Sequence, residues 1–149
     1  MPIAWADKPG LQAHLNDAGY YTIRRDGVFN AVRTSDNATG PDIDTAVQAL
    51  IDSYDPVDFV KSEKREEIKA EGLSRITSIF PALSDLDELK LEQDRWLSIA
   101  PAARQPTTDY QKAIDIYVAA RNAIRSINSE TDWTVVNAYD VVTGPSWPV

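Results

Sequence analysis

From residue 57 to residue 128, apolar residues recur every three or four positions along the chain. This spacing gathers them on one face of a helix, and such a face must be buried against another element. Prolines interrupt the pattern only where a turn would separate two helices. The pattern therefore predicts a mainly α protein built around a small helical bundle.

Prolines and capping residues set the expected limits of the helices. The helices are expected over about 44–54, 57–80, 84–100, 107–128 and 130–139. Asp42 or Asp44 is expected to cap the first of them, because an aspartate side chain accepts hydrogen bonds from the free N–H groups of a helix N-terminus. The closing residues 141–149 are expected to be extended.

The front of the chain carries a different signal. Two β-prone runs, residues 20–25 and 28–33, flank Asp26 and Gly27. An Asp-Gly pair favours the type I′ turn of a β-hairpin, because both central residues of that turn need positive φ. We therefore expect an N-terminal β-hairpin, preceded by a short helix within residues 8–18. A hairpin alone is marginally stable in water, so this one must pack on helices, gain a third strand or pair with another chain.

The charge is unevenly distributed. Residues 1–40 contain four basic and four acidic residues, so the whole net charge of −8 lies in residues 41–149. Such a surface repels phosphate backbones and anionic lipid, which argues against nucleic-acid and membrane partners. We divide the chain into residues 1–43, a hairpin-containing interaction segment, and residues 44–149, a helical bundle domain with an extended C-terminal tail.

No set of residues points to catalysis or to a bound cofactor. The chain has no cysteine, and His14 is its only histidine, so a metal site or a catalytic triad would lack partners. We interpret His14 as a helix-surface or interface residue. Asp42-Ile43-Asp44 begins like a calcium loop but lacks the later glycine and glutamate, so helix capping explains it better. We expect no catalytic residues, no metal and no cofactor.

The aromatic residues are better candidates for function. Trp5 and Trp147 lie near the two ends of the chain, in segments expected to be extended. Tryptophan is enriched in interface hot spots, so these side chains either dock on a neighbouring molecule or fold back on their own bundle. With the aromatic residues of the hairpin, they form the predicted partner-binding set: Trp5, Tyr20, Tyr21, Phe29 and Trp147.

Several segments resemble small tail-associated proteins of tailed bacteriophages. Residues 46–56 end in Tyr-Asp-Pro, and the helix that follows reads Ile-Lys-Ala-Glu at residues 68–71. The phage proteins carry a similar Tyr-Asp-Pro step into a helix reading Ile-x-Ala-Glu. Residues 96–107 and the closing Trp147-Pro148 are similar as well. The resemblance covers about residues 44–149, and residues 1–43 lie outside it.

The resemblance implies a non-enzymatic structural protein of the virion, located in the tail, baseplate or tail fibre and assembled in the host cytoplasm. Such an adaptor binds other virion proteins, and the possibility that it forms a homo-oligomer stays open. The alternative is a tail-fibre assembly chaperone that is absent from the mature virion. Two other classes stay open from the residues themselves. One is a small hydrolase that uses carboxylates within residues 85–94, and the other is a regulatory module whose acidic surface mimics nucleic acid.

Overall fold

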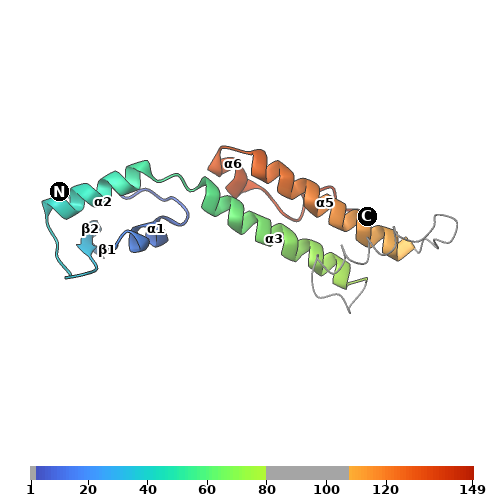
Figure 1. Cartoon of the computed structure of the whole chain (residues 1–149), viewed down its shortest axis with the longest axis horizontal. Coiled ribbons are helices and arrows are strands. Elements are labelled where there is room, and N and C mark those ends of the chain that lie inside the picture. Colours follow the sequence, from blue (N-terminus) through green and yellow to red (C-terminus); the bar gives the residue numbers. More distant parts are fainter. Residues whose placement is uncertain (1–2, 80–107) are drawn as a thin grey trace. The chain divides into compact units, whose positions relative to one another are not determined.

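The computed structural model describes residues 3–79 and 108–149. Its elements are α1 (Leu11–Asp17), β1 (Tyr20–Arg25), β2 (Val28–Arg33), α2 (Pro41–Ser53), α3 (Val57–Thr77), α5 (Thr108–Ser129) and α6 (Trp133–Ala138) (Figure 1). The chain divides into two compact units, Met1–Val60 and Lys61–Val149. A mainly helical protein with an N-terminal β-hairpin is thus confirmed. The helix expected over 84–100 and the acidic run within it lie outside the described residues.

The hairpin forms where turn chemistry predicted it. β1 and β2 pair antiparallel from Tyr20 opposite Arg33 to Arg25 opposite Val28. At the turn, Asp26 has φ 51° and Gly27 has φ 81°. Positive φ at both positions is what a type I′ turn requires, and its twist matches that of the two strands.

The outer edge of β2 is covered by other parts of the N-terminal unit. The Ile3 N–H donates to the Phe29 carbonyl at 3.2 Å, which makes a short third-strand contact. Further along the strand, the Ala31 N–H donates to Asp44 Oδ1 at 3.3 Å. The Arg33 N–H donates to a loop carbonyl at 3.0 Å. The hairpin therefore both gains a third-strand contact and packs on helices.

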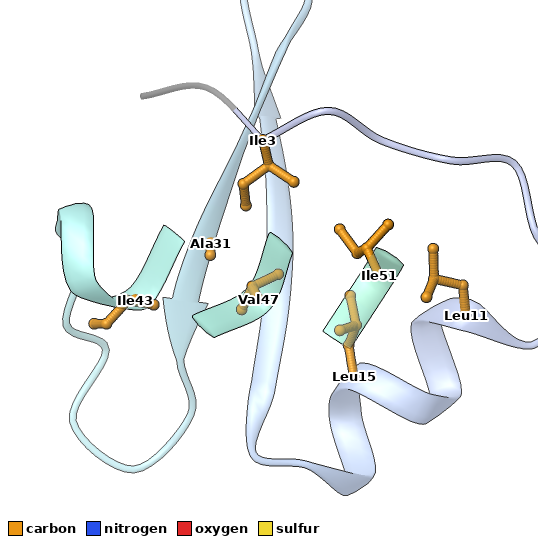
Figure 2. Close-up of a cluster of buried hydrophobic side chains, with 7 residues drawn as sticks. All are labelled: Ile3, Leu11, Leu15, Ala31, Ile43, Val47 and Ile51. Carbon is orange, nitrogen blue, oxygen red and sulfur yellow. The ribbon is translucent and has the colours of Figure 1, made fainter. Parts of the chain in front are cut away.

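One apolar cluster joins the elements of the N-terminal unit. It is formed by seven buried side chains from the N-terminal segment, α1, β2 and α2, which are Ile3, Leu11, Leu15, Ala31, Ile43, Val47 and Ile51. Leu11 and Leu15 are four positions apart and share one face of α1, from which they approach Ile51 of α2 (Figure 2). The burial of these faces holds a small sheet and two helices together.

The start of α2 differs from the prediction. The helix begins at Pro41, and Gly40 is its N-cap residue without a side-chain hydrogen bond. Asp42 and Asp44 lie in the first turn instead, so the prediction that one of them caps the helix is wrong. Proline favours the first helical position, because its φ suits the helix and its missing N–H would have had no intrahelical partner. α2 packs on the hairpin, so the N-terminal unit extends past residue 43, where the sequence was divided.

In the second unit, α3 and α5 run antiparallel side by side (Figure 1). At one end of the pair, Lys61 Nζ donates to the Asn128 carbonyl at 3.0 Å, and Arg65 Nη1 donates to Asn128 Oδ1 at 2.8 Å. At the other end, Ile76 of α3 is buried with Ala113 and Ile116 of α5. The apolar periodicity of the sequence thus corresponds to a packed helix pair.

The C-terminal segment is not simply extended. After α6, the Gly144 N–H donates to the Asp140 carbonyl at 2.7 Å and closes a turn. Gly144 leaves little room for a larger residue, since a Cβ there would lie 2.6 Å from Tyr139 Cζ. The expectation of an extended tail over 141–149 is therefore wrong for its first half, where local hydrogen bonds favour a turn.

Candidate functional site

Two members of the predicted partner-binding set, Trp5 and Phe29, contact each other. Their rings stack with centroids 4.9 Å apart and an interplanar angle of 15°. The guanidinium of Arg24, which lies opposite Phe29 in the hairpin, is 5.5 Å from the Phe29 centroid. Both aromatic side chains are half-buried. Stacking of this kind contributes about 0.5–1.5 kcal/mol beyond the area it buries, and it fixes the ring orientations.

The backbone beside Trp5 is held by α2. The Ala4 N–H donates to Gln48 Oε1 at 2.8 Å, and Gln48 Nε2 donates back to the Ala4 carbonyl at 3.3 Å. The amide of Gln48 therefore pairs with Ala4 much as a neighbouring strand would. Together with the Ile3–Phe29 pairing, this contact fixes the position of Trp5 from both sides of the N-terminal segment.

Tyr20 and Tyr21 lie on opposite faces of the hairpin, since successive strand residues alternate in direction. Tyr20 packs against the buried cluster of the N-terminal unit. Tyr21 lies on the outer face, and its hydroxyl donates to Asn37 Oδ1 at 3.2 Å. The structure therefore brings Trp5, Phe29 and Tyr20 to the core-facing side of the hairpin and leaves Tyr21 on the other.

Trp147, the fifth member of the set, belongs to the second unit. It packs against the buried cluster of Ile76, Ala113 and Ile116, and its Nε1 donates to the Val141 carbonyl at 3.1 Å. The guanidinium of Arg75 lies 5.0 Å from its ring centroid. Both terminal tryptophans thus pack against their own units and stay half-buried. A role in partner binding stays a prediction for all five residues.

Sequence reasoning missed a group of contacts around the end of α2. Lys8 Nζ donates to the carbonyls of Ile51 and Tyr54, at 2.9 and 2.7 Å. These are carbonyls that a helix C-terminus leaves without an intrahelical partner. The Tyr54 hydroxyl donates to the Pro9 carbonyl at 3.0 Å, and the Tyr54 ring stacks on His14 at 4.6 Å. His14 is therefore a half-buried packing residue of α1.

Nothing in the spacing of the sequence joins residue 8 to residue 54. The only hint of this contact near Lys8 is Gly10, a glycine directly before α1. In the structure Gly10 has φ 75°. A glycine in that conformation indicates a tight turn or a close approach by another element. It did not identify which element approaches.

A groove runs beside the N-terminal segment and α2, with a volume of about 550 Å³. Its lining combines apolar side chains with two carboxylates: Ile3, Pro41, Asp44, Thr45, Gln48, Ala49 and Asp52. Within residues 3–79 and 108–149, no three His, Cys, Asp or Glu side chains are grouped as a metal site would need. Over the same residues, no helix has the length and apolar character needed to cross a membrane.

The loop after the hairpin holds one strongly shifted carboxyl group. Arg33 Nε and Nη2 donate to the two oxygens of Asp36 at 3.0 and 2.6 Å. The hydrogen bond from Arg33, followed by one from the Ala38 N–H, lowers the pKa of Asp36 to about 2. Both charged side chains are exposed, so we attribute only a small stabilisation to the pair.

We expect this pair to make a small pH-dependent contribution to stability. Because the pKa of Asp36 is lower in the folded chain than its ordinary value of 3.8, ionisation favours the folded state above that value. The contribution is lost as the pH falls from about 4 to about 2. A carbon-13 NMR titration should give a midpoint near 2 for the Asp36 carboxyl, and Arg33→Gln should return the midpoint toward the ordinary value. A midpoint near 4 in the unmodified chain would contradict the prediction.

Comparisons of the chain with protein-family models, with curated proteins and with solved structures found no match.

Proposed function

We propose that the chain is a non-enzymatic structural protein of a phage virion, an adaptor of the tail, baseplate or tail fibre that binds neighbouring subunits. The assignment to phage tails rests on the resemblance of residues 44–149 described above. The binding role rests on one observation: the N-terminal unit presents half-buried aromatic side chains that its own backbone holds in place. Trp5 and Phe29 are stacked, and Tyr21 is anchored through its hydroxyl.

Fixed aromatic side chains suit protein recognition for a physical reason. A large ring that is already oriented loses little conformational freedom when a partner covers it. Aromatic residues also dominate the small number of positions that contribute most to binding energy. The N-terminal unit thus offers anchors at a low entropic cost.

Charge supports the same assignment of roles to the two ends of the chain. Residues 1–40 have no net charge, whereas residues 41–149 carry the full −8. The N-terminal unit also includes residues 41–60, which contain five aspartates and no basic residue, so only its hairpin part is neutral. A partner that docks on the hairpin meets less repulsion there than at α2. We therefore assign subunit contacts to the hairpin and a spacing role to the helices.

Mass spectrometry of virions tests the proposal. Particles of the phage or induced prophage that encodes the chain would be purified on a density gradient and washed in high salt. We expect the chain at a fixed ratio to a major tail protein in every preparation. A chain that is present during assembly and missing from mature particles would instead support the tail-fibre assembly chaperone. If the chain is found neither in assembling particles nor in mature ones, the proposal that it is a virion protein is wrong.

A pair of variants tests the part played by the hairpin. Tyr21→Ala removes a half-buried ring that lies opposite the buried Val32 in the hairpin, and it should lower incorporation into particles. Tyr21→Phe keeps the ring and loses only the hydrogen bond to Asn37, so it should be incorporated normally. Circular dichroism of both purified variants would check folding. Equal incorporation of the two variants would argue against Tyr21 as a binding residue.

A further inference from the structure

The two edges of the hairpin differ in their hydrogen bonding. On β2, the backbone groups of Phe29, Ala31 and Arg33 point away from β1, and each has a partner on that side. Their cross-strand neighbours on β1 are Arg24, Thr22 and Tyr20. In an antiparallel pair, residues directly opposite each other share the direction of their backbone groups, so these three point away from β2.

The edge of β1 has no such partners. Within residues 3–79 and 108–149, no hydrogen bond reaches the outward backbone N–H or C=O groups of Tyr20, Thr22 and Arg24. The Thr22 side chain bonds to Gln12 Oε1 at 2.9 Å, but this contact leaves the Thr22 backbone free. β1 therefore presents a row of donors and acceptors in the arrangement that another strand would pair with.

β1 also lacks several of the features that usually protect a sheet edge, although α1 packs against it and its Gln12 bonds to the Thr22 side chain. Its six residues, Tyr-Tyr-Thr-Ile-Arg-Arg, include no proline or glycine, and they pair with β2 in an unbroken register without a bulge. Edge strands that must stay unpaired commonly carry a proline, a bulge or an inward-pointing charge. The charges of β1 are confined to the turn end of the strand, where Arg24 lies on the core-facing side over the Phe29 ring.

We propose that β1 pairs with β1 of a second copy of this chain, antiparallel about a two-fold axis at Thr22, to form a four-stranded sheet. In this register, Thr22 lies opposite the partner's Thr22, and Tyr20 lies opposite the partner's Arg24. All three outward residues of each strand then exchange both of their backbone hydrogen bonds. This inference goes beyond the proposed virion function and does not depend on it.

The side chains of β1 favour this register over others, and they favour a second copy of the chain as the strand that pairs with β1. Arg24 lies opposite the partner's Tyr20, and because its guanidinium stays over the Phe29 ring of its own chain, this pairing opposes no like charges. On the other face, Tyr21 lies opposite the partner's Ile23, an aromatic and β-branched pair of the kind that stabilises sheets. A register centred on Arg24 would oppose two arginines, which is destabilising. The edge is thus complementary to itself, as a two-fold interface requires.

Sedimentation of the full chain tests the pairing. We expect a monomer–dimer equilibrium in analytical ultracentrifugation over a range of concentrations. Thr22→Pro removes an outward N–H and takes nothing from the β1–β2 ladder, so it should raise the dimer dissociation constant at least about tenfold. Thr22→Ala keeps the N–H and loses the bond to Gln12, and it should dimerise as the unmodified chain does. A chain that stays monomeric at all concentrations would overturn the proposal, as would a Thr22→Pro variant that dimerises normally.

Cross-linking tests the register even if the proline variant fails to fold. The chain contains no cysteine, so a single introduced thiol reports on one position. Opposite residues of a hydrogen-bonded pair have Cα atoms about 5.5 Å apart, within disulfide range. Mild oxidation should therefore link two copies of Thr22→Cys. Two copies of Arg24→Cys would be about 13 Å apart along the strands and should not link. Equal linking of the two variants, or none with Thr22→Cys, would overturn the register.

Discussion

Leu15→Ala is expected to lower the free energy of unfolding by about 2–5 kcal/mol. Leu15 is fully buried, and its side chain lies between α1 and α2 in the cluster that joins the N-terminal unit (Figure 2). The substitution removes apolar contacts and leaves a cavity that the hairpin and two helices can fill only in part. Urea unfolding of the full chain, followed by circular dichroism and by tryptophan fluorescence, would measure the loss.

A volume-conserving change at the same position provides the control. Leu15→Met keeps nearly the same volume, so it should cost less than about 1.5 kcal/mol. If the alanine and methionine variants unfold at the same urea concentration with equal slopes, Leu15 does not fill the core as described. A loss confined to the alanine variant would locate the stability of this unit in the burial of α1.

Gly10→Ala should destabilise the chain by a similar amount, about 2–5 kcal/mol, for a different reason. Gly10 has φ 75°, a conformation that costs residues with a Cβ about 1–2 kcal/mol. In addition, a Cβ on Gly10 would lie 2.7 Å from the Tyr54 hydroxyl and 2.7 Å from Phe59 Cγ. Either the rings or the backbone must move, and the backbone beside Gly10 is tied to Tyr54 by the Lys8 hydrogen bond and by the bond from the Tyr54 hydroxyl to the Pro9 carbonyl. Urea unfolding again measures the effect.

Gly19→Ala separates the two contributions. Gly19 has φ 88°, but a Cβ there would meet nothing within 4 Å. This variant should therefore bear the backbone cost alone, about 1–2 kcal/mol. Equal losses for the two glycine variants would show that the close approach of Tyr54 and Phe59 to Gly10 adds nothing.

The hairpin was predictable because the information for it is local. Asp26-Gly27 specifies the turn, and the turn type and loop length set the register of the flanking strands. The helices α3 and α5 were predictable for a related reason, since apolar residues at helical spacing indicate a helix without reference to its partner. For the candidate site, sequence reasoning selected aromatic residues whose role in partner binding stays a prediction, and it did not show that Trp5 stacks on Phe29 or that Tyr20 and Tyr21 separate onto opposite faces.

The start of α2 and the course of the C-terminal segment could not be predicted in the same way. Asp42 and Asp44 looked like capping residues, but Pro41 took the first helical position, and Asp44 instead accepts a hydrogen bond from β2. For Trp147 the sequence left two alternatives, docking on a neighbour or folding back on its own bundle, and the structure shows it packed on α3 and α5. At the start of α2 one local preference, proline at the first helical position, outweighed another, whereas only packing decided the position of Trp147.

The residues alone were enough to establish a mainly helical chain, a hairpin at its front and a neutral N-terminal end, because turn chemistry, periodicity and charge depend on near neighbours in the chain. Packing decided the rest: which carbonyls Lys8 caps, which ring covers Phe29, and which strand edge is left without partners. These features join residues more than twenty positions apart, or depend on what lies beside a strand in space. Their energy comes from burial and hydrogen bonding that exist only once the elements have come together.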